Sequence, residues 1–180
     1  VNNIIGDSQS ICYGTTAAEV SGETVSGGTP PLQFIWLSST TGPAGGFAPA
    51  AGTNDNKHFV PGTLTQTVWY KRVAYDAIYS DTSNVIKVEV RPLPEKPVIS
   101  TQPPVPVCRG AEYLNFGAIK EPPVGVDYQW SASSALMYAQ GSTKQYSLIS
   151  FPDSGVARVT LTATQNGCVS STEATYVVSG

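Results

Sequence analysis

His58 is the only histidine of the 180-residue chain, so a catalytic triad or a cysteine–histidine pair would have to use it. It lies in Asn56-Lys57-His58-Phe59, where we expect a loop to lead into a strand. No Gly-x-Ser-x-Gly nucleophile motif is present, and no glycine-rich loop precedes a helical pattern to hold phosphate. A zinc site at His58 would need further thiolates or imidazoles nearby. We therefore interpret His58 as a surface residue and expect no enzymatic activity.

A cluster of oxygen-bearing side chains could bind a cation. Asn54, Asp55 and Asn56 follow one another in a predicted loop, and calcium takes amide and carboxylate oxygens readily. The regular spacing of a calcium-binding loop is missing, however, and turns rich in Asn and Asp are common without any metal. Both interpretations stay open at this stage: a weak calcium site, or a turn without a cofactor. The Asp76 and Asp81 pair is similar.

Two neighbouring aromatic residues could bind a sugar. Trp69 and Tyr70 stand side by side on one predicted strand, so their side chains point to opposite faces of a sheet. One interpretation is an aromatic platform on which a sugar ring stacks. The other is one core residue plus one residue that covers an edge or a domain junction.

A pattern that occurs twice predicts the architecture that would position these residues. Cys12-Tyr-Gly14 is followed by Phe34-Ile-Trp36, and Cys108-Arg-Gly110 is followed by Tyr128-Gln-Trp130. The Cys-to-Trp gaps are 24 (36 − 12) and 22 (130 − 108) residues. Repetition at a spacing the size of a domain indicates tandem copies of one fold. We expect both tryptophans to be core residues, as in immunoglobulin-type sandwiches.

Alternating apolar and β-branched runs between turn residues predict an all-β fold without helices. The proline-rich stretch at 91–97 is the natural boundary. We therefore predict two immunoglobulin-like β-sandwich modules in tandem, at residues 1–91 and 92–180. The expected strands are Ala17–Ser21, Gln33–Leu37, Thr67–Tyr75, Asn84–Arg91, Val98–Gln102, Tyr113–Phe116, Asp127–Ala132, Gln145–Ile149, Val156–Gln165 and Thr172–Ser179.

Composition narrows the range of partners. Charged residues make up 13% of the chain, about half the usual share, and the net charge is −3. The ten basic residues form no cluster, which argues against nucleic-acid binding. No apolar stretch is long enough for a membrane helix. A surface rich in hydroxyl groups and poor in charge favours secretion, and the chain resembles a piece of a longer protein.

The three cysteines allow two states. In a reducing compartment all three would be buried thiols. In an oxidising one, Cys108 and Cys168 would pair within the second module and leave Cys12 over. Their separation of 60 residues (168 − 108) suits a bridge between two sheets, and such a bridge stabilises by about 4 kcal/mol in the chain-entropy model.

The order of these motifs resembles a known group of proteins. The first copy adds Phe59-Val-Pro61 and Val68-Trp69-Tyr70 to its Cys and Trp motifs, and the second ends in Asn166-Gly-Cys168. Both resemble the tandem immunoglobulin-like and PKD-like modules of very large secreted surface proteins of Bacteroidetes. That group includes gliding-motility adhesins of the SprB type and other long type IX-secreted chains.

The resemblance implies a non-catalytic stalk or spacer, with possible adhesion contacts, at the cell surface. Its partners would be neighbouring repeats of the parent chain, and surface polysaccharide or further copies of the chain. In such modules the early cysteine usually pairs with a later one, which is missing where this chain reads Ala77-Ile78-Tyr79-Ser80. Cys12 is therefore expected to be a free thiol, and the first module to be the weaker. Loop 38–51 is the expected binding surface.

Two alternatives belong to other classes. The modules could be carbohydrate-binding accessory domains of a secreted enzyme, with Trp69 or Tyr70 exposed. They could instead assemble into a filament through an unpaired edge strand, for which Thr172–Ser179 is the candidate.

Overall fold

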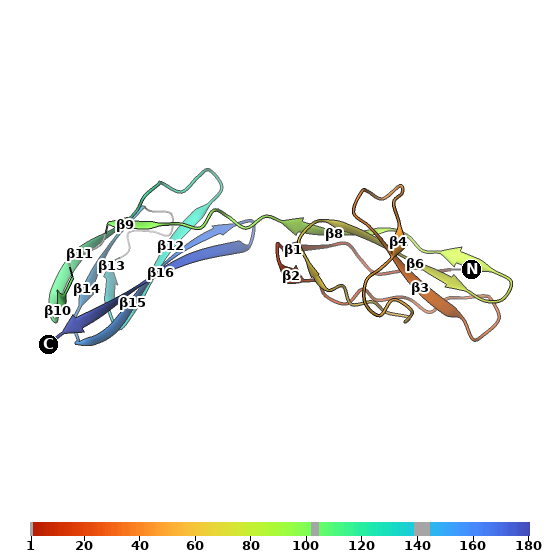
Figure 1. Ribbon diagram of the computed structural model, residues 1–180, viewed down its shortest axis with the longest axis horizontal. Helices are drawn as coiled ribbons and strands as arrows, with labels where there is room; N and C mark the ends of the chain where they lie inside the picture. Colours follow the sequence, from red (N-terminus) through yellow and green to blue (C-terminus); the bar gives the residue numbers. More distant parts are fainter. Residues whose placement is uncertain (1, 102–104, 139–144) are drawn as a thin grey trace. The chain divides into compact units, whose positions relative to one another are not determined.

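The computed structural model describes residues 2–101, 105–138 and 145–180, and these form strands, turns and loops without a helix (Figure 1). The all-β prediction is confirmed. The chain divides into two compact units, Val1–Pro92 and Leu93–Gly180. The predicted modules end and begin one residue earlier, inside the same proline-rich stretch.

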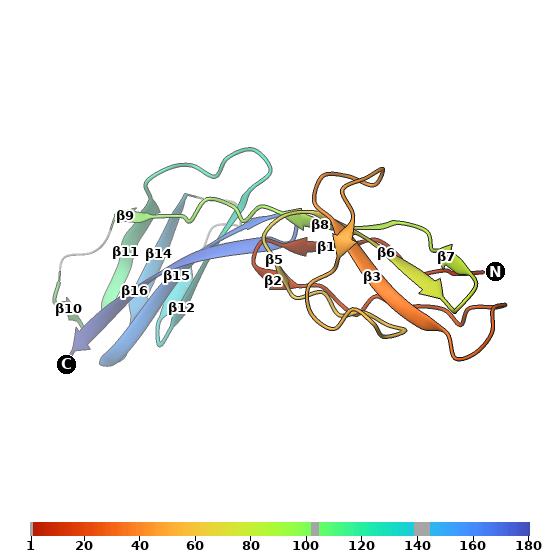
Figure 2. The same cartoon turned by 45° about the vertical axis from the view of Figure 1, so that its right-hand side comes forward.

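The first unit is built on one six-stranded sheet (Figure 2). Its first strand pairs parallel with its last strand, and the other pairings are antiparallel. The sheet has the order β1 (Gln9–Cys12), β8 (Ile86–Arg91), β6 (Val68–Tyr75), β3 (Gln33–Ser39), β4 (Ala48–Pro49), with β7 (Ser80–Thr82) also paired to β6. A separate pair is formed by β2 (Thr15–Thr16) and β5 (Thr63–Leu64).

Strict alternation along β6 builds the core of this unit. Every second side chain from Val68 to Ala74 is buried, and the residues between them are half-buried on the other face. Trp36 of β3 is fully buried and stacks on Phe59 with ring centroids 5.4 Å apart. The prediction that Trp36 is a core residue is confirmed.

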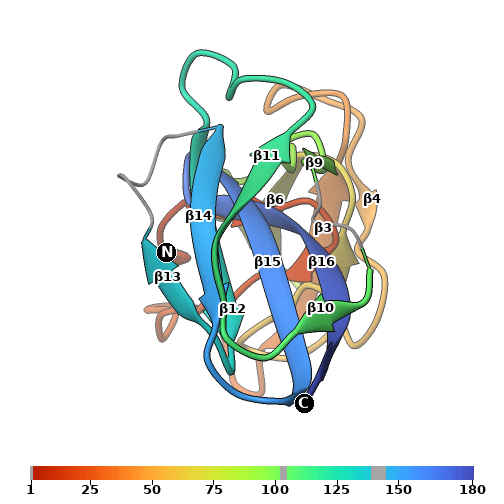
Figure 3. The same ribbon diagram turned by 90° about the vertical axis from the view of Figure 1, so that its left-hand side faces the viewer.

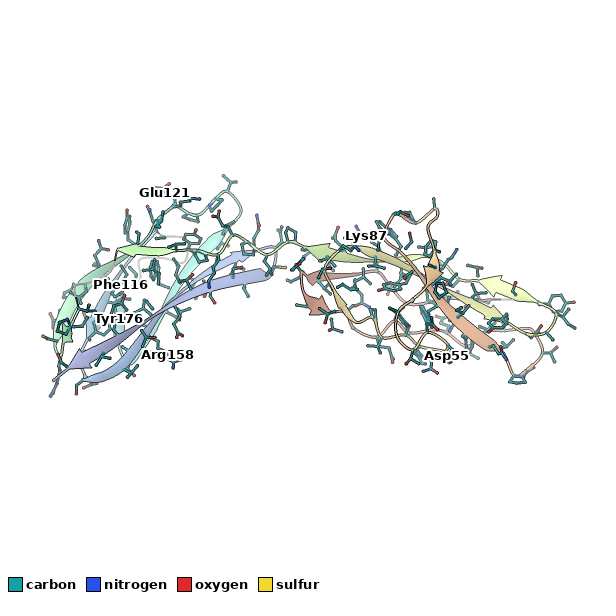
Figure 4. The ribbon with its side chains drawn as sticks, viewed as in Figure 1. Asp55, Lys87, Phe116, Glu121, Arg158 and Tyr176 are labelled. Atoms are coloured by element: carbon teal, nitrogen blue, oxygen red, sulfur yellow. The ribbon has the colours of Figure 1, made fainter. Side chains whose placement is uncertain are left out.

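The second unit consists of two four-stranded sheets that enclose a common core (Figure 3). Phe116, Trp130 and Tyr176 come from different strands and lie in that core, where Phe116 and Tyr176 meet edge to face at 5.5 Å (Figure 4). One sheet has the order β10 (Val107–Cys108), β16 (Cys168–Ser179), β15 (Gly155–Gln165), β12 (Asp127–Ser133). The other has the order β13 (Leu136–Tyr138), β14 (Tyr146–Phe151), β11 (Ala111–Ala118), β9 (Ile99–Thr101).

One predicted strand is wrong. Residues 17–21 form no strand; Val20 makes only an isolated bridge to Phe59. The first strand of the chain is β1, and its residues do not alternate between buried and exposed positions. Its extended conformation is fixed by pairing with β8, which is distant in the sequence. The predicted strand Val98–Gln102 is present as β9, and Gln102 lies outside the described residues.

The cysteine prediction is also wrong. Cys12 and Cys168 are disulfide-bonded, and Cys108 is a free, exposed thiol. Topology explains why Cys108 and Cys168 do not pair. Cys108 pairs with Ser179 at the last residue of β16, whereas Cys168 is the first residue of that strand. Eleven residues of extended chain (179 − 168) separate these positions by about 36 Å, and a disulfide needs Cα atoms within about 7 Å.

Candidate functional site

The end of the β3–β6 ladder in the first unit brings two polar side chains together. Gln33, the first residue of β3, lies directly opposite Tyr75, the last residue of β6. Directly opposed residues in an antiparallel pair project from the same face, so the amide and the phenol ring share one surface. The loops that precede β3 and follow β6 meet at this end.

Asp76 connects those two loops. Its Oδ2 accepts the N–H of Thr29 at 2.7 Å, and its Oδ1 accepts the N–H groups of Ile78 and Tyr79 at 2.7 and 2.8 Å. These three bonds favour the ionised carboxylate and lower the pKa of Asp76 below its ordinary value of 3.8. Gly28 has φ +83°, and an added Cβ would lie 3.3 Å from Asp76 Oδ2, so glycine lets the loop approach this carboxylate.

A pocket of about 560 Å³ lies between the loops. Tyr75, Pro30 and Pro31 give it ring surfaces, and Gln33 gives it an amide. Ile78, 76% exposed, belongs to its rim. The described residues that line it are Thr29, Pro30, Pro31, Gln33, Tyr75, Asp76, Ala77 and Ile78.

The buried guanidinium of Arg72 lies on the core side of β6, near this end of the ladder. Arg72 lies three residues before Tyr75 on β6 and is fully buried. Its Nη2 and Nε donate to Asn3 Oδ1 at 2.7 and 3.0 Å, and its Nη1 donates to the carbonyl of Lys57 at 2.8 Å. Its Nη2 also donates to the carbonyl of Glu23 at 3.0 Å. Arg72 therefore joins three segments that are distant in the sequence.

The charge of Arg72 is stabilised mainly by dipoles and aromatic rings. Among the described residues no carboxylate forms an ion pair with it, and burial lowers the pKa of its guanidinium. The guanidinium carbon lies 4.7 Å from the ring centroid of Phe34 and 5.9 Å from that of Trp36. An arginine keeps its charge under such conditions, so the acceptors around it must stay in place.

The predicted sugar platform lies elsewhere on β6, and Tyr70 cannot take part in it. Tyr70 is 4% exposed and tilts against Phe59 in the core, so it cannot stack on a ligand. Trp69 is half-buried on the outer face of β6, opposite Ser39 and Lys87. The prediction that the two side chains point to opposite faces is correct, and the assignment of Tyr70 to ligand binding is wrong.

The predicted calcium loop helps to hold a core tryptophan. The main-chain carbonyl of Asn54 accepts the N–H of Trp36 at 2.7 Å, and the carbonyl of Asn56 accepts its indole N–H at 2.9 Å. Asn54 Nδ2 donates to the carbonyl of Ala50 at 2.7 Å, while Asp55 is exposed on the surface (Figure 4). Within residues 2–101, 105–138 and 145–180, no three His, Cys, Asp or Glu side chains form a group that could hold a metal ion.

Three further predictions concern surface residues. His58 is exposed, and its Nδ1 accepts the N–H of Gly22 at 3.1 Å. Loop 38–51 is partly closed by Ser39, which is buried and donates to the carbonyl of Gly45 at 2.7 Å. The edge of β16 is partly covered, because Ser170 and Thr172 donate to the carbonyls of Pro94 and Pro97 and β10 pairs with its last two residues.

Sequence reasoning did not single out Arg72, Gln33 or Tyr75. The signal for Arg72 was available, since the alternation of β6 places it on the same face as Val68 and Tyr70. No sequence pattern indicates the pocket, because it is formed by two loops that are 47 residues (76 − 29) apart in the sequence.

Residues 1–92 match the family model of a domain of unknown function, DUF8696. The chain belongs to this family. The matched range ends at the last residue of the first unit, so this domain and the first compact unit coincide. A comparison with curated proteins finds no match. In the part of the chain that the structure describes, no helix has the length and apolar composition needed to cross a membrane.

Proposed function

We propose that the chain is a non-catalytic, load-bearing segment of a large protein that is secreted or displayed at the cell surface. The observation that carries this proposal is a shared pairing. In the first unit β1 pairs parallel with β8, and in the second β10 pairs parallel with β16. Each unit therefore joins an early strand directly to its last strand, side by side and in the same direction.

Parallel pairing of this kind resists a pulling force along the chain. Once the disulfide is reduced, tension pulls β1 from its N-terminal side and β8 from its C-terminal side, in opposite directions along their common axis. The hydrogen bonds between them run across the strands and are loaded together, so they must break together. The β1–β8 ladder aligns four residues of each strand, Gln9–Cys12 with Val88–Arg91.

The N-terminal segment adds a second attachment in the first unit. Asn3 Nδ2 donates to the carbonyls of Arg72 and Asp81, at 3.1 and 2.8 Å, and its Oδ1 accepts from Arg72. Ile5 exchanges two hydrogen bonds with the side chain of Asn84, at 2.9 and 3.2 Å. Both lie upstream of β1, so a load from the N-terminus reaches these attachments before it reaches the ladder.

The disulfide-bonded cysteines and the composition of the chain support a location outside the cell. Cys12 and Cys168 are disulfide-bonded, which indicates an oxidising environment. The low share of charged residues and the resemblance to tandem modules of secreted surface proteins fit display outside the cell. Protease shaving of intact cells, with mass spectrometry of the released peptides, tests the location; protection of this chain in intact cells would contradict it.

Single-molecule stretching in a reducing buffer tests the load-bearing role. Tyr13 N–H donates to the carbonyl of Arg91, and strand donors alternate, so the N–H of Ile11 also faces β8 while that of Ser10 faces away. We expect Ile11→Pro to lower the unfolding force of the first unit, and Ser10→Pro to lower it far less. Equal unfolding forces for the wild type and both variants would overturn the proposal.

A further inference from the structure

We propose that the pocket between the loops of the first unit binds a neutral oligosaccharide. The pocket is formed by the end of the β3–β6 ladder and the loops around Asp76 described above. A load-bearing segment needs no such site. The inference therefore goes beyond the proposed function, and either one can fail without the other.

Charge excludes the other common ligand classes. Among the described residues of the lining, Asp76 is the only charged one, and none of them is Lys, Arg or His. An anionic ligand such as a phosphate or a sulfated glycan would meet a carboxylate and find no cation. A metal ion or an ammonium group is disfavoured, because Asp76 is the single carboxylate among the described lining residues and three main-chain N–H groups already use most of its acceptor positions. A neutral ligand remains.

The lining matches a molecule that has both apolar faces and hydroxyl edges. A pyranose ring presents C–H groups on its faces, and these would pack on the flat ring of Tyr75 and on the apolar rings of Pro30 and Pro31. Its hydroxyl groups need partners that donate and accept. The Gln33 amide and the Thr29 hydroxyl do both. The volume of about 560 Å³ lies within the usual range for small-molecule sites.

The site is held in place before any ligand arrives. Asp76 fixes the two loops to each other, and Arg72 fixes the strand below them to the N-terminal segment. Little conformational entropy is then lost on binding, which favours affinity for a small ligand.

Isothermal titration of the full chain tests the inference. The probes are neutral hexasaccharides of the cello-, xylo-, manno-, malto-, laminari- and N-acetylchito- series, with a heparin hexasaccharide and a proline-rich decapeptide as the competing classes. We expect saturable binding of at least one neutral probe and none of the heparin or peptide probes. Binding of no neutral probe at millimolar concentration, or preferential binding of heparin or the peptide, would overturn the proposal.

Three variants locate the site. Gln33→Ala changes an exposed side chain, and Tyr75→Ala removes the ring of its cross-strand neighbour; each should weaken binding by about tenfold or more. Trp69→Ala is the matched control, an aromatic residue on the same outer face of the same strand, and should leave affinity within about twofold. Circular dichroism checks that each variant folds. Loss of binding in Trp69→Ala with retention in Gln33→Ala would place the ligand elsewhere and refute the inference.

Discussion

At the scale of single residues, Arg72 shows how a buried charge can organise a β unit. Its guanidinium satisfies acceptors from Asn3, Lys57 and Glu23, which belong to segments that no ladder joins to β6. Removing the donors leaves several of those acceptors buried without partners, and each such group costs about 1–3 kcal/mol. The free energy lost on removing the guanidinium therefore comes mainly from leaving buried acceptors without partners. The net stabilisation from forming the network is smaller.

Arg72→Met should lower the free energy of unfolding of the first unit by about 3 kcal/mol or more. The control is Arg158→Met, because Arg158 is exposed (Figure 4) and its ion pair with Glu173, at 3.6 Å, is solvent-accessible. This control should change stability by no more than about 0.5 kcal/mol. Urea unfolding followed by tryptophan fluorescence measures both. A midpoint of the first unit that is the same in Arg72→Met as in the wild type would contradict the assigned role.

Gly22 is the glycine that this network requires. An added Cβ would lie 1.8 Å from Arg72 Nη1 and 2.2 Å from the carbonyl oxygen of Lys57, so main chain as well as side chain would have to move. Gly22→Ala should destabilise the first unit by about 2–3 kcal/mol. Gly62→Ala is the control, since its added Cβ would meet no atom within 4 Å. Thermal melting of the two variants distinguishes them, and an unchanged melting temperature for Gly22→Ala would refute the prediction.

Tyr176 carries a buried hydroxyl group that does not contribute to the stability of the second unit. Its side chain packs against Phe116 and Phe151, and its oxygen has no hydrogen-bond partner among the described residues. Tyr176→Phe removes a buried polar atom and keeps the ring, so we expect it to stabilise the second unit by about 1 kcal/mol. Tyr146→Phe, at a half-exposed position, should have no effect. A destabilised Tyr176→Phe protein in urea unfolding would show that the hydroxyl has a partner.

At the scale of elements, the loop pair of the first unit depends on an ionised carboxylate. The pKa of Asp76 is lowered because three N–H groups bond the charged form. A depressed pKa means that the stabilisation is present above 3.8 and is lost as the pH falls through the lower, folded value. The amide resonances of Thr29, Ile78 and Tyr79 should therefore titrate together below pH 3.8. In Asp76→Asn this shared titration should vanish, and a midpoint at or above pH 3.8 in the wild type would contradict the assignment.

The elements also show what the sequence can and cannot predict. Alternation alone located β6 and β15, because one face of each strand is buried along its length. It missed β1, whose residues do not alternate and whose partner β8 lies 79 residues away (88 − 9). The pocket was missed for the same reason, since Gln33 and Tyr75 become neighbours only through strand register. Local pattern predicts burial well, but it does not predict which distant segments pair.

At the scale of the whole molecule, the reactivity of the three cysteines tests the strand topology of the second unit. It distinguishes this topology from the Cys108–Cys168 bridge that the spacing of the cysteines predicts. The 60-residue gap between Cys108 and Cys168 favoured a bridge, but parallel pairing puts Cys108 at the far end of β16. Iodoacetamide should therefore label Cys108 in the unreduced protein, and label Cys12 and Cys168 only after reduction. Reduction should lower the free energy of unfolding by about 2–5 kcal/mol. Cys108→Ser, by contrast, should leave it unchanged, because that thiol is exposed and free. Recovery of a peptide from the monomer in which Cys108 is linked to Cys168 would mean that β10 does not pair with the end of β16, and would overturn the parallel ladder of the second unit.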